Sequence, residues 1–376
     1  MTVGTDSHAT STTDGPNGGV TLLTGASALR SVEDSWKALE VANDLPVFQR
    51  FAWAETWLEH WGHSGEPWLL VAGTQPRAIL PLFHTRRAGL RILTLIGHGI
   101  SDYLGPICDS VDSAAELGAA LGQLTRRVDL TVLRGVNPDV DVSVRFLAAI
   151  DTPLSSRLYE RCPAISTQDG WQHFWQGRKS KFRANFKHMQ RRVERLGKAV
   201  IRTETASPQL FDAMIDVERA SWKWKEGLSF LRNPTFRAFL QDIVLQKRVP
   251  LEIWTCRIGG KLVGFAIVFR LEQAWHYYLP SYREDSWGSG LYLMAEIIKR
   301  CCELGLSEFD FLGGDEDYKK RWMTHAHRTD EVVIPGRLPF GPILAGASRA
   351  RWLLARSQRL REVRRCLLVA WRRIRT

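Results

Sequence analysis

The stretch W-G-S-G at residues 287–290 has the composition of a loop that binds phosphate groups. Gly288 and Gly290 lack the Cβ atoms that would hold a phosphate away from the backbone. If a helix begins here, its first N–H groups and its dipole favour a pyrophosphate. Ser289 adds a hydroxyl donor and Arg283 a positive charge. The alternative interpretation is a plain turn between a strand and a helix.

Two closely spaced histidine pairs raise the question of a metal site. They are His60 with His63 and His325 with His327. No acidic or thiol partner stands at ligand spacing, so we interpret them as structural or surface histidines and expect no metal. The six cysteines, at positions 108, 162, 256, 301, 302 and 366, include no C-x-x-C pair. We therefore expect no disulfide framework, and this cysteine usage suits a reducing cytosol.

Positive charge is concentrated in two segments of this 376-residue chain of net charge +11. Residues 178–202 hold ten Lys and Arg against Glu194, and residues 341–376 hold ten Arg against Glu362. The rest of the chain is therefore acidic overall. Each basic segment combines an apolar stripe with cationic faces, which favours contact with phosphates, nucleic acid or a membrane surface. A solvated cationic face over an apolar core stripe is the alternative.

The apolar patterns predict a mixed α/β protein with two halves. No window reaches 18 apolar residues, so no transmembrane helix is expected. We predict a disordered leader (1–20), an N-terminal α/β domain (21–165), a C-terminal domain (166–340) and a basic amphipathic helix (341–376), with a connection at 162–170. Predicted helices cover 31–42, 51–60, 114–127, 208–225, 234–246 and 317–322, and one more follows the glycine loop. Predicted strands in the second half cover 199–203, 251–258, 261–270, 274–280, 307–313 and about 331–335.

The second half resembles a GNAT acyltransferase in the order of its elements: strand, two helices, three antiparallel strands, glycine loop, helix, strand, helix, strand. The segments L-V-G-F-A-I-V-F-R, Y-Y-L-P-S-Y, W-G-S-G-L-Y-L and F-D-F-L-G-G-D-E-D-Y-K-K-R-W are similar to those of the CelD/BcsL-like acetyltransferases associated with cellulose and exopolysaccharide synthesis. The resemblance covers about 171–335 well and the first half by general layout. It implies a GNAT fold, α/β (α+β), with two GNAT-like halves in tandem.

The resemblance also implies how the reaction proceeds. GNAT-like enzymes use direct attack of an amine or hydroxyl on a thioester, which needs a base and an acid. Tyr318 stands where several GNAT enzymes place a tyrosine acid. Asp310, Asp315 and Glu316 are candidates for a base or for orienting the substrate. The alternative for D-E-D (315–317) is helix capping and favourable interaction with the helix dipole.

The resemblance further implies a binding site for acetyl-CoA as co-substrate. The pantetheine arm would lie along the strand before the loop and the pyrophosphate at the loop, so the expected contacts are Tyr278, Leu279, Arg283, Gly288, Ser289, Gly290 and Leu291. Glu218, Trp222 and Lys223 match the E-x-x-S-W-K motif on the first helix, which borders the acceptor site, and Lys319 joins this group. For Trp222, packing in the core is the alternative to stacking on a substrate.

These features predict a cytoplasmic acyl-CoA-dependent N- or O-acyltransferase. From the family association, its small-molecule or glycan acceptor would be a sugar or polysaccharide precursor. One alternative is a double-GNAT aminoacyl transferase that uses aminoacyl-tRNA, with the phosphate backbone against residues 178–202. Another is a non-enzymatic protein that binds nucleic acid, or the inner face of a membrane, through the basic helices at 178–202 and 349–375.

Overall fold

A computed structural model describes residues 11–12 and 19–336 of the chain. The predicted basic helix at 341–376 and most of the predicted leader lie outside the described residues. Within the leader, Ser11–Thr12 form strand β1, which pairs with Leu22 and Thr21 of strand β2. Among the described helices, none is both long and apolar enough to cross a membrane.

The first half alternates helices and strands, as predicted. Its elements are β2 (Val20–Thr24), α1 (Ala26–Ser31), α2 (Glu33–Asn43), α3 (Phe51–Trp61), β3 (Gly65–Ala72), β4 (Ala78–Arg87), β5 (Leu90–Leu95), β6 (Ile107–Cys108), α4 (Val111–Thr125), β7 (Leu130–Val136) and α5 (Asp141–Ala148). The helices predicted at 51–60 and 114–127 are present. The helix predicted at 31–42 is α2, and the shorter α1 precedes it.

The second half follows the predicted order of elements. They are β8 (Ser155–Ser166), α6 (Gly170–Gln176), α7 (Ser180–Arg195), β9 (Ala199–Glu204), α8 (Pro208–Arg219), α9 (Trp222–Glu226), α10 (Pro234–Leu245), β10 (Leu251–Ile258), β11 (Lys261–Arg270), β12 (Ala274–Tyr282), α11 (Ser289–Glu303), β13 (Glu308–Asp310), α12 (Asp317–Trp322) and β14 (His325–Pro335). The strands predicted at 251–258 and 261–270 and the helix at 317–322 have the predicted bounds.

Four predicted elements differ from the structure. The strand predicted at 307–313 is β13, which covers only Glu308–Asp310. The helix predicted at 208–225 is two helices, because the Ser221 hydroxyl accepts a hydrogen bond from the Trp224 N–H and starts α9. The stretch predicted as a connection at 162–170 begins inside β8, which extends to Ser166. The last strand begins at His325 rather than near residue 331, because its polar first part pairs with β8.

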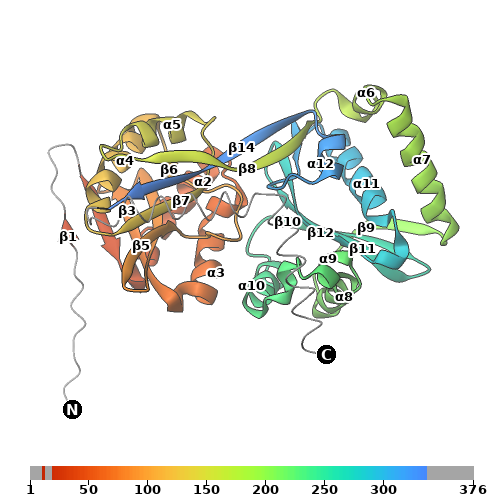
Figure 1. Ribbon diagram of the computed structural model, residues 1–376, viewed down its shortest axis with the longest axis horizontal. Coiled ribbons are helices and arrows are strands. Elements are labelled where there is room, and N and C mark those ends of the chain that lie inside the picture. Colours follow the sequence, from red (N-terminus) through yellow and green to blue (C-terminus); the bar gives the residue numbers. More distant parts are fainter. Residues whose placement is uncertain (1–10, 13–18, 337–376) are drawn as a thin grey trace, which may run out of the picture.

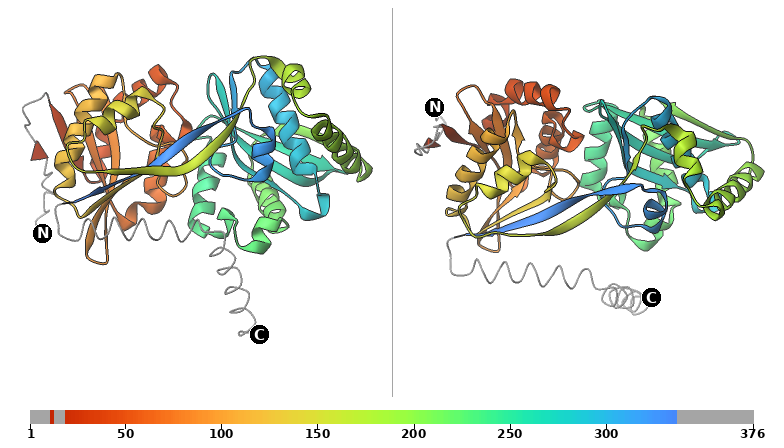
Figure 2. Two further views of the ribbon diagram at one scale, coloured as in Figure 1. Left: turned by 45° about the horizontal axis from the view of Figure 1, so that its top comes forward. Right: turned by 90° about the horizontal axis from the view of Figure 1, so that it is seen from above.

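One sheet runs through both halves, in the order β1-β2-β3-β4-β5-β7-β14-β8-β13-β12-β11-β10-β9, with β6 paired to β4. Strands β8 and β14 are long, antiparallel to each other, and pass from one half to the other (Figure 1). The C-terminal part of β14 pairs with β7 of the first half. The C-terminal end of β8 pairs with β13 of the second half. The halves are thus joined by strand pairing, and they lie side by side in the other views as well (Figure 2).

Helices cover both faces of the second half's sheet. Helices α8 and α10 lie on one face, and α11 with α6 and α7 on the other (Figure 1). The first of these cores continues into the first half through aromatic contacts. The ring of Trp53 on α3 packs edge-on against Phe239 of α10, with centroids 4.9 Å apart, and against Phe269 of β11. This shared core fixes the first half next to the strands that carry the candidate site.

Candidate active site

The edge of β12 loses its neighbouring strand half-way along. Parallel pairing with β13 involves only Ala274, Trp275 and His276, whereas β12 continues to Tyr282. A shift in the pairing with β11 leaves Tyr278 without a partner residue, between Tyr277 and Leu279. After β13 the chain stays hydrogen-bonded to β8, through the N–H groups of Phe311 and Gly314, rather than to β12. The second part of β12 therefore presents backbone groups that an extended ligand can use.

Lys223 lies beside this unpaired edge. Its ammonium group donates a hydrogen bond of 2.6 Å to the carbonyl of Pro280. Burial lowers the pKa of Lys223, although the nearby carboxylates of Glu218 and Glu316 act to raise it. Lys319 is close enough to lower it further. The three predicted acceptor residues Glu218, Lys223 and Lys319 therefore lie near one another, although they come from α8, α9 and α12.

Glu218 is the most enclosed member of this group. Its side chain is buried, and its Oε2 has no hydrogen-bond partner within the described residues. A buried carboxylate oxygen without a partner is costly and therefore rare. An acceptor amine or hydroxyl could supply the missing donor. Trp222 is exposed rather than packed in the core, and its indole N–H donates to the hydroxyl of Tyr282.

The first half contributes a carboxylate that the sequence analysis missed. Asp102 accepts a hydrogen bond from the N–H of Gly313 and lies near Lys319. Burial raises the pKa of Asp102 to about 6, although the positive charge of Lys319 opposes the shift. The Lys319 ammonium donates 2.6 Å to the Gly313 carbonyl and pairs with Glu316 at 3.2 Å. No spacing in the sequence connects residue 102 to residue 313, so only the fold reveals this contact.

Tyr318 lies on the same short helix as Lys319. Its ring packs edge-on against Phe311, with centroids 6.4 Å apart. Burial, with smaller effects from Tyr277, Glu316 and Tyr282, raises its pKa well above 10. Its hydroxyl has no hydrogen bond to any described residue. The side chain is therefore protonated at neutral pH and free to donate to a ligand.

The two predicted aspartates occupy different environments. Asp310 is buried, and its two oxygens accept hydrogen bonds of 2.6 Å from the Tyr103 hydroxyl and the Leu312 N–H. Burial raises the pKa of Asp310 to about 7. Asp315 is exposed and pairs with Lys320 at 3.0 Å. Neither therefore has the enclosed, unpartnered oxygen that Glu218 has.

The capping interpretation of D-E-D is wrong. The residue at the N-cap of α12 is Glu316, and no side chain makes a capping hydrogen bond there. Asp317 lies in the first turn of the helix, where only the interaction with the dipole remains.

Helix α11 begins at the glycine loop, as predicted. The N–H groups of Ser289, Gly290 and Leu291 make no hydrogen bond within the described part of the chain. Arg283 forms a bidentate pair with Asp285, at 3.2 Å for each bond, and the Ser289 hydroxyl is buried against Ser286. The backbone donors are therefore available to an anion, whereas the predicted side-chain contacts are used within the protein.

The two glycines of the loop are explained by packing. Gly288 has φ = +95°, and a Cβ there would lie 2.7 Å from Met189 Cγ on α7. A Cβ on Gly290 would lie 2.5 Å from Tyr282 Cδ1. Both glycines would therefore be needed even without a phosphate.

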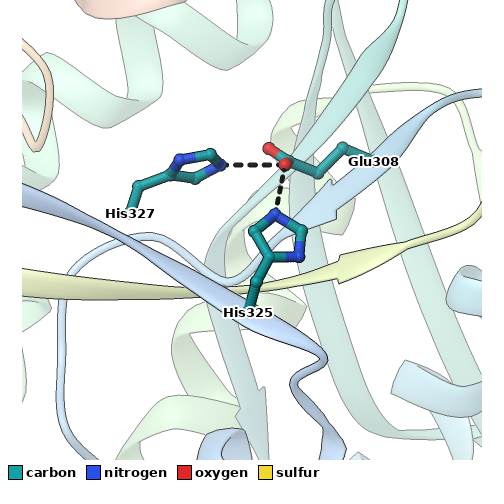
Figure 3. A group of neighbouring side chains, drawn as sticks. All are labelled: Glu308, His325 and His327. Carbon is teal, nitrogen blue, oxygen red and sulfur yellow. Dashed lines mark hydrogen bonds and ion pairs between the residues drawn. The ribbon is translucent and has the colours of Figure 1, made fainter. Parts of the chain in front are cut away.

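A second polar group lies apart from these residues, on β13 and β14. Glu308 Oε2 is 2.8 Å from Nε2 of His325 and 2.8 Å from Nε2 of His327 (Figure 3). Burial acts to raise the pKa of Glu308, but the two histidines outweigh it and lower this pKa. In turn, the hydrogen bond to Glu308 raises the pKa of His327. The expectation that this histidine pair lacks an acidic partner is wrong, because strand pairing brings in a residue 17 positions away from His325.

A family model described as an acetyltransferase (GNAT) domain matches residues 180–320. Residues 180–320 form a GNAT acyltransferase domain. The matched segment runs from α7 into α12 and contains Glu218, Lys223, Tyr318, Lys319 and the glycine loop. The predictions of an acyltransferase and of a mixed α/β GNAT fold are confirmed. No curated protein matches the sequence.

Solved structures share the fold of the GNAT domain together with the first half. FemX has a TM-score of 0.57 at 10% identity, covering 82% of this chain and 96% of its own. The C-terminal domain of a putative lysylphosphatidylglycerol synthetase from Agrobacterium fabrum has a TM-score of 0.54 at 11% identity, covering 85% and 96%. L-PGS from Bacillus licheniformis has a TM-score of 0.50 at 12% identity, covering 79% of this chain and 95% of its own. Such low identities show a common fold and leave the substrate undetermined.

Proposed function

We propose that the GNAT domain transfers an acetyl group from acetyl-CoA to an amine or hydroxyl acceptor. The observation that carries this proposal is that Glu218, Lys223 and Lys319 lie near one another beside the unpaired edge of β12. Tyr318, next to Lys319 on α12, lies near Tyr282 at the end of β12. This edge leads directly into the free N–H groups at the start of α11. One surface therefore offers an extended backbone edge, anion donors and groups that transfer protons.

The residues present suit acetyl-CoA. The backbone at Tyr278 and Leu279 would hold the pantetheine arm, and the N–H groups of Ser289, Gly290 and Leu291 the pyrophosphate, at a helix start that favours negative charge. Arg283 would contribute if the phosphate replaced Asp285 as its partner. The bound thioester supplies an activated acyl carbon for direct attack.

Proton transfer then falls to two side chains of the protein. Glu218 Oε2 accepts the proton of the attacking amine or hydroxyl, since this oxygen is buried and has no donor among the described residues. The Tyr318 hydroxyl donates a proton to the leaving thiolate. Lys223 and Lys319 orient the acceptor. Asp310, hydrogen-bonded to Tyr103, supports the loop through the Leu312 N–H, and Asp315 lies at the exposed rim.

In this proposal the acceptor is a sugar or polysaccharide precursor. The choice of acceptor is supported by the resemblance to the CelD/BcsL-like acetyltransferases. A cytoplasmic location follows from the supply of acetyl-CoA. Thermal shift with acetyl-CoA, longer acyl-CoAs and bulk tRNA tests the donor. Acetyl transfer to a panel of amino sugars and nucleotide sugars tests the acceptor. Stabilisation by tRNA but not by any acyl-CoA would contradict the proposal.

A specific surface favours a second candidate, aminoacyl transfer from tRNA. Helix α7 exposes five cations, Lys181, Lys187, Arg191, Arg192 and Arg195, while Met189 and Val193 are buried beneath it. Such a face suits a phosphate backbone or an anionic membrane. A fold shared with a protein named a putative lysylphosphatidylglycerol synthetase is compatible with an aminoacyl donor. A steep salt dependence of tRNA binding, reduced in an Arg191→Ala/Arg195→Ala variant, would support it.

A further inference from the structure

We propose that Glu308, His325 and His327 form a binding site for a divalent transition-metal ion such as Zn²⁺. The three ligand atoms, one carboxylate oxygen and two imidazole nitrogens, all lie within 4.8 Å of one another. The site is separate from the acyl-transfer residues and does not depend on the proposed function.

Strand pairing places the three side chains on one face of the sheet. On β8, Ser166 is paired with Glu308, Ala164 with His325 and Cys162 with His327. These positions alternate along β8, so their partners point to the same side. Ala164, the β8 residue paired with His325, has a small side chain that leaves room on this face of β8. Figure 3 shows Glu308 pointing toward both histidines. The arrangement is therefore built by three strands and not by a mobile loop.

The hydrogen bonds of His325 indicate which nitrogen is free. Its Nδ1 is 3.0 Å from the Thr324 hydroxyl, and that hydroxyl lies within 3.4 Å of the Ala164 carbonyl, to which it can donate. When Thr324 donates to that carbonyl, its oxygen accepts from the Nδ1–H of His325. In the neutral imidazole this leaves a lone pair on Nε2, facing the Glu308 oxygen at 2.8 Å. In the metal-free protein a proton on Nε2 satisfies this contact, and a bound metal ion would take the place of that proton.

The distances and ligand types suit a transition metal. Ligand bonds of about 2.0–2.1 Å place two donor atoms about 2.9 Å apart at right angles and about 3.4 Å apart at the tetrahedral angle that Zn²⁺ prefers. The 2.8 Å nitrogen–oxygen distances would therefore lengthen by about half an ångström around a tetrahedral ion. Two imidazoles and one carboxylate are ligands that Zn²⁺, Co²⁺ and Fe²⁺ accept, whereas Mg²⁺ and Ca²⁺ prefer oxygen alone. His325 and His327 are 40% and 33% exposed, so an ion can enter and keep open positions for water.

A bound ion would connect β13 to β14 across β8. Because β14 also pairs with β7 of the first half, the ion would stabilise the strands that join the halves. An ion that binds only the folded protein raises the melting temperature in proportion to the logarithm of its concentration.

The test is a Zn²⁺ titration of the full chain, purified without a polyhistidine tag, by calorimetry and by competition with a chromophoric chelator. We expect one saturable Zn²⁺ site. Co²⁺ bound at this site should give visible d–d absorption bands. Loss of an outer-sphere partner typically weakens metal binding by about 10–100-fold, so loss of a ligand in His327→Ala or His325→Ala should weaken it by at least about 100-fold. The matched control is His173→Ala, an exposed histidine on α6, which should bind Zn²⁺ like the parent.

Melting curves without metal show whether each variant is folded, and two ligand variants are used so that one misfolded protein does not end the test. Mg²⁺ in 100-fold excess should not displace Zn²⁺. The proposal is overturned if the parent shows no saturable Zn²⁺ binding, if both ligand variants bind as the parent does, or if Mg²⁺ competes.

Discussion

At the scale of single residues, the proposed proton transfers depend on burial of the side chains of Glu218, Lys223 and Tyr318. The buried Glu218 oxygen without a partner can take a proton, and Tyr318, whose pKa is raised well above 10, can give one. Lys223 is tied to the Pro280 carbonyl at 2.6 Å, which positions its charge beside the β12 edge.

Replacing Tyr318 by Phe should reduce turnover by about 10²–10⁴-fold and change acetyl-CoA affinity little. The substitution removes one hydroxyl that makes no hydrogen bond to a described residue, so the fold should be unaffected. Single-turnover kinetics and calorimetry separate the two effects. Tyr292→Phe, on the half-buried face of α11, is the control. Unchanged turnover in Tyr318→Phe would remove this hydroxyl from the mechanism.

Asp102 should make stability depend on pH. Its folded pKa of about 6 exceeds the value of 3.8 in the unfolded chain, so the folded state holds the proton longer. Its contribution to the free energy of unfolding therefore falls between pH 4 and 6, by about 2–3 kcal/mol, and stays low above pH 6. Asp102→Asn should gain stability relative to the parent over this range. Urea unfolding at pH 4 and pH 7 measures the difference in the free energy of unfolding between Asp102→Asn and the parent. An equal difference at both pH values would refute the raised pKa of Asp102.

The sequence could predict Glu218, Lys223 and Lys319 as acceptor-binding residues and Tyr318 as a candidate acid, because they match motifs of a recognisable family. It could not predict Asp102, Tyr103 or the partner of His325. Their contacts join residues far apart in the chain. Asp102 and Tyr103 lie in the loop between β5 and β6, which packs against residues 310–313, whereas the Glu308–His325 contact depends on strand pairing; apolar periodicity encodes neither.

At the scale of elements, the start of α11 has two roles. It offers free N–H donors, and its glycines let Tyr282 and Met189 pack closely. The sequence predicted this helix and loop, with a phosphate site or a plain turn as the reason for the glycines, but not their close approach to Tyr282 and Met189. A single Gly290→Glu substitution would therefore disturb packing and binding together.

A double variant separates these effects. Tyr282→Ala removes the ring that a side chain at residue 290 would meet, and Tyr282→Ala/Gly290→Glu then adds a carboxylate beside the N–H donors. Loss of two charge-assisted hydrogen bonds, at about 1.5–3 kcal/mol each, should weaken acetyl-CoA binding by roughly two to four orders of magnitude relative to Tyr282→Ala. Calorimetry on both proteins measures this. Equal affinities would place the pyrophosphate elsewhere.

The whole molecule is held together by one sheet and a shared aromatic core. The first half was expected to be a separate domain, and the sequence gives no sign that β14 crosses into it, since its polar first part, H-A-H-R-T, does not follow a core pattern. The part of the chain that pairs with β7 lies about 200 residues later. Such long-range pairing is set by packing of the complete fold.

Trp53→Ala should lower the free energy of unfolding by about 3–5 kcal/mol. The indole is fully buried between Phe239 and Phe269, and its N–H donates to Ser101 at 2.9 Å. Leu228→Ala, at a side chain 60% exposed, should change stability by less than about 0.5 kcal/mol. Denaturant unfolding followed by fluorescence compares the two. Similar small changes in both would mean that the halves are not joined through this core.

The most direct measurement of the central claim is a calorimetric titration of the full chain with acetyl-CoA at moderate salt, followed by the same titration with Lys223→Met. The parent should show saturable 1:1 binding that free CoA displaces, and Lys223→Met should bind acetyl-CoA but transfer no acetyl group to any acceptor that the parent uses. Absence of saturable acetyl-CoA binding by a folded parent protein would contradict the account.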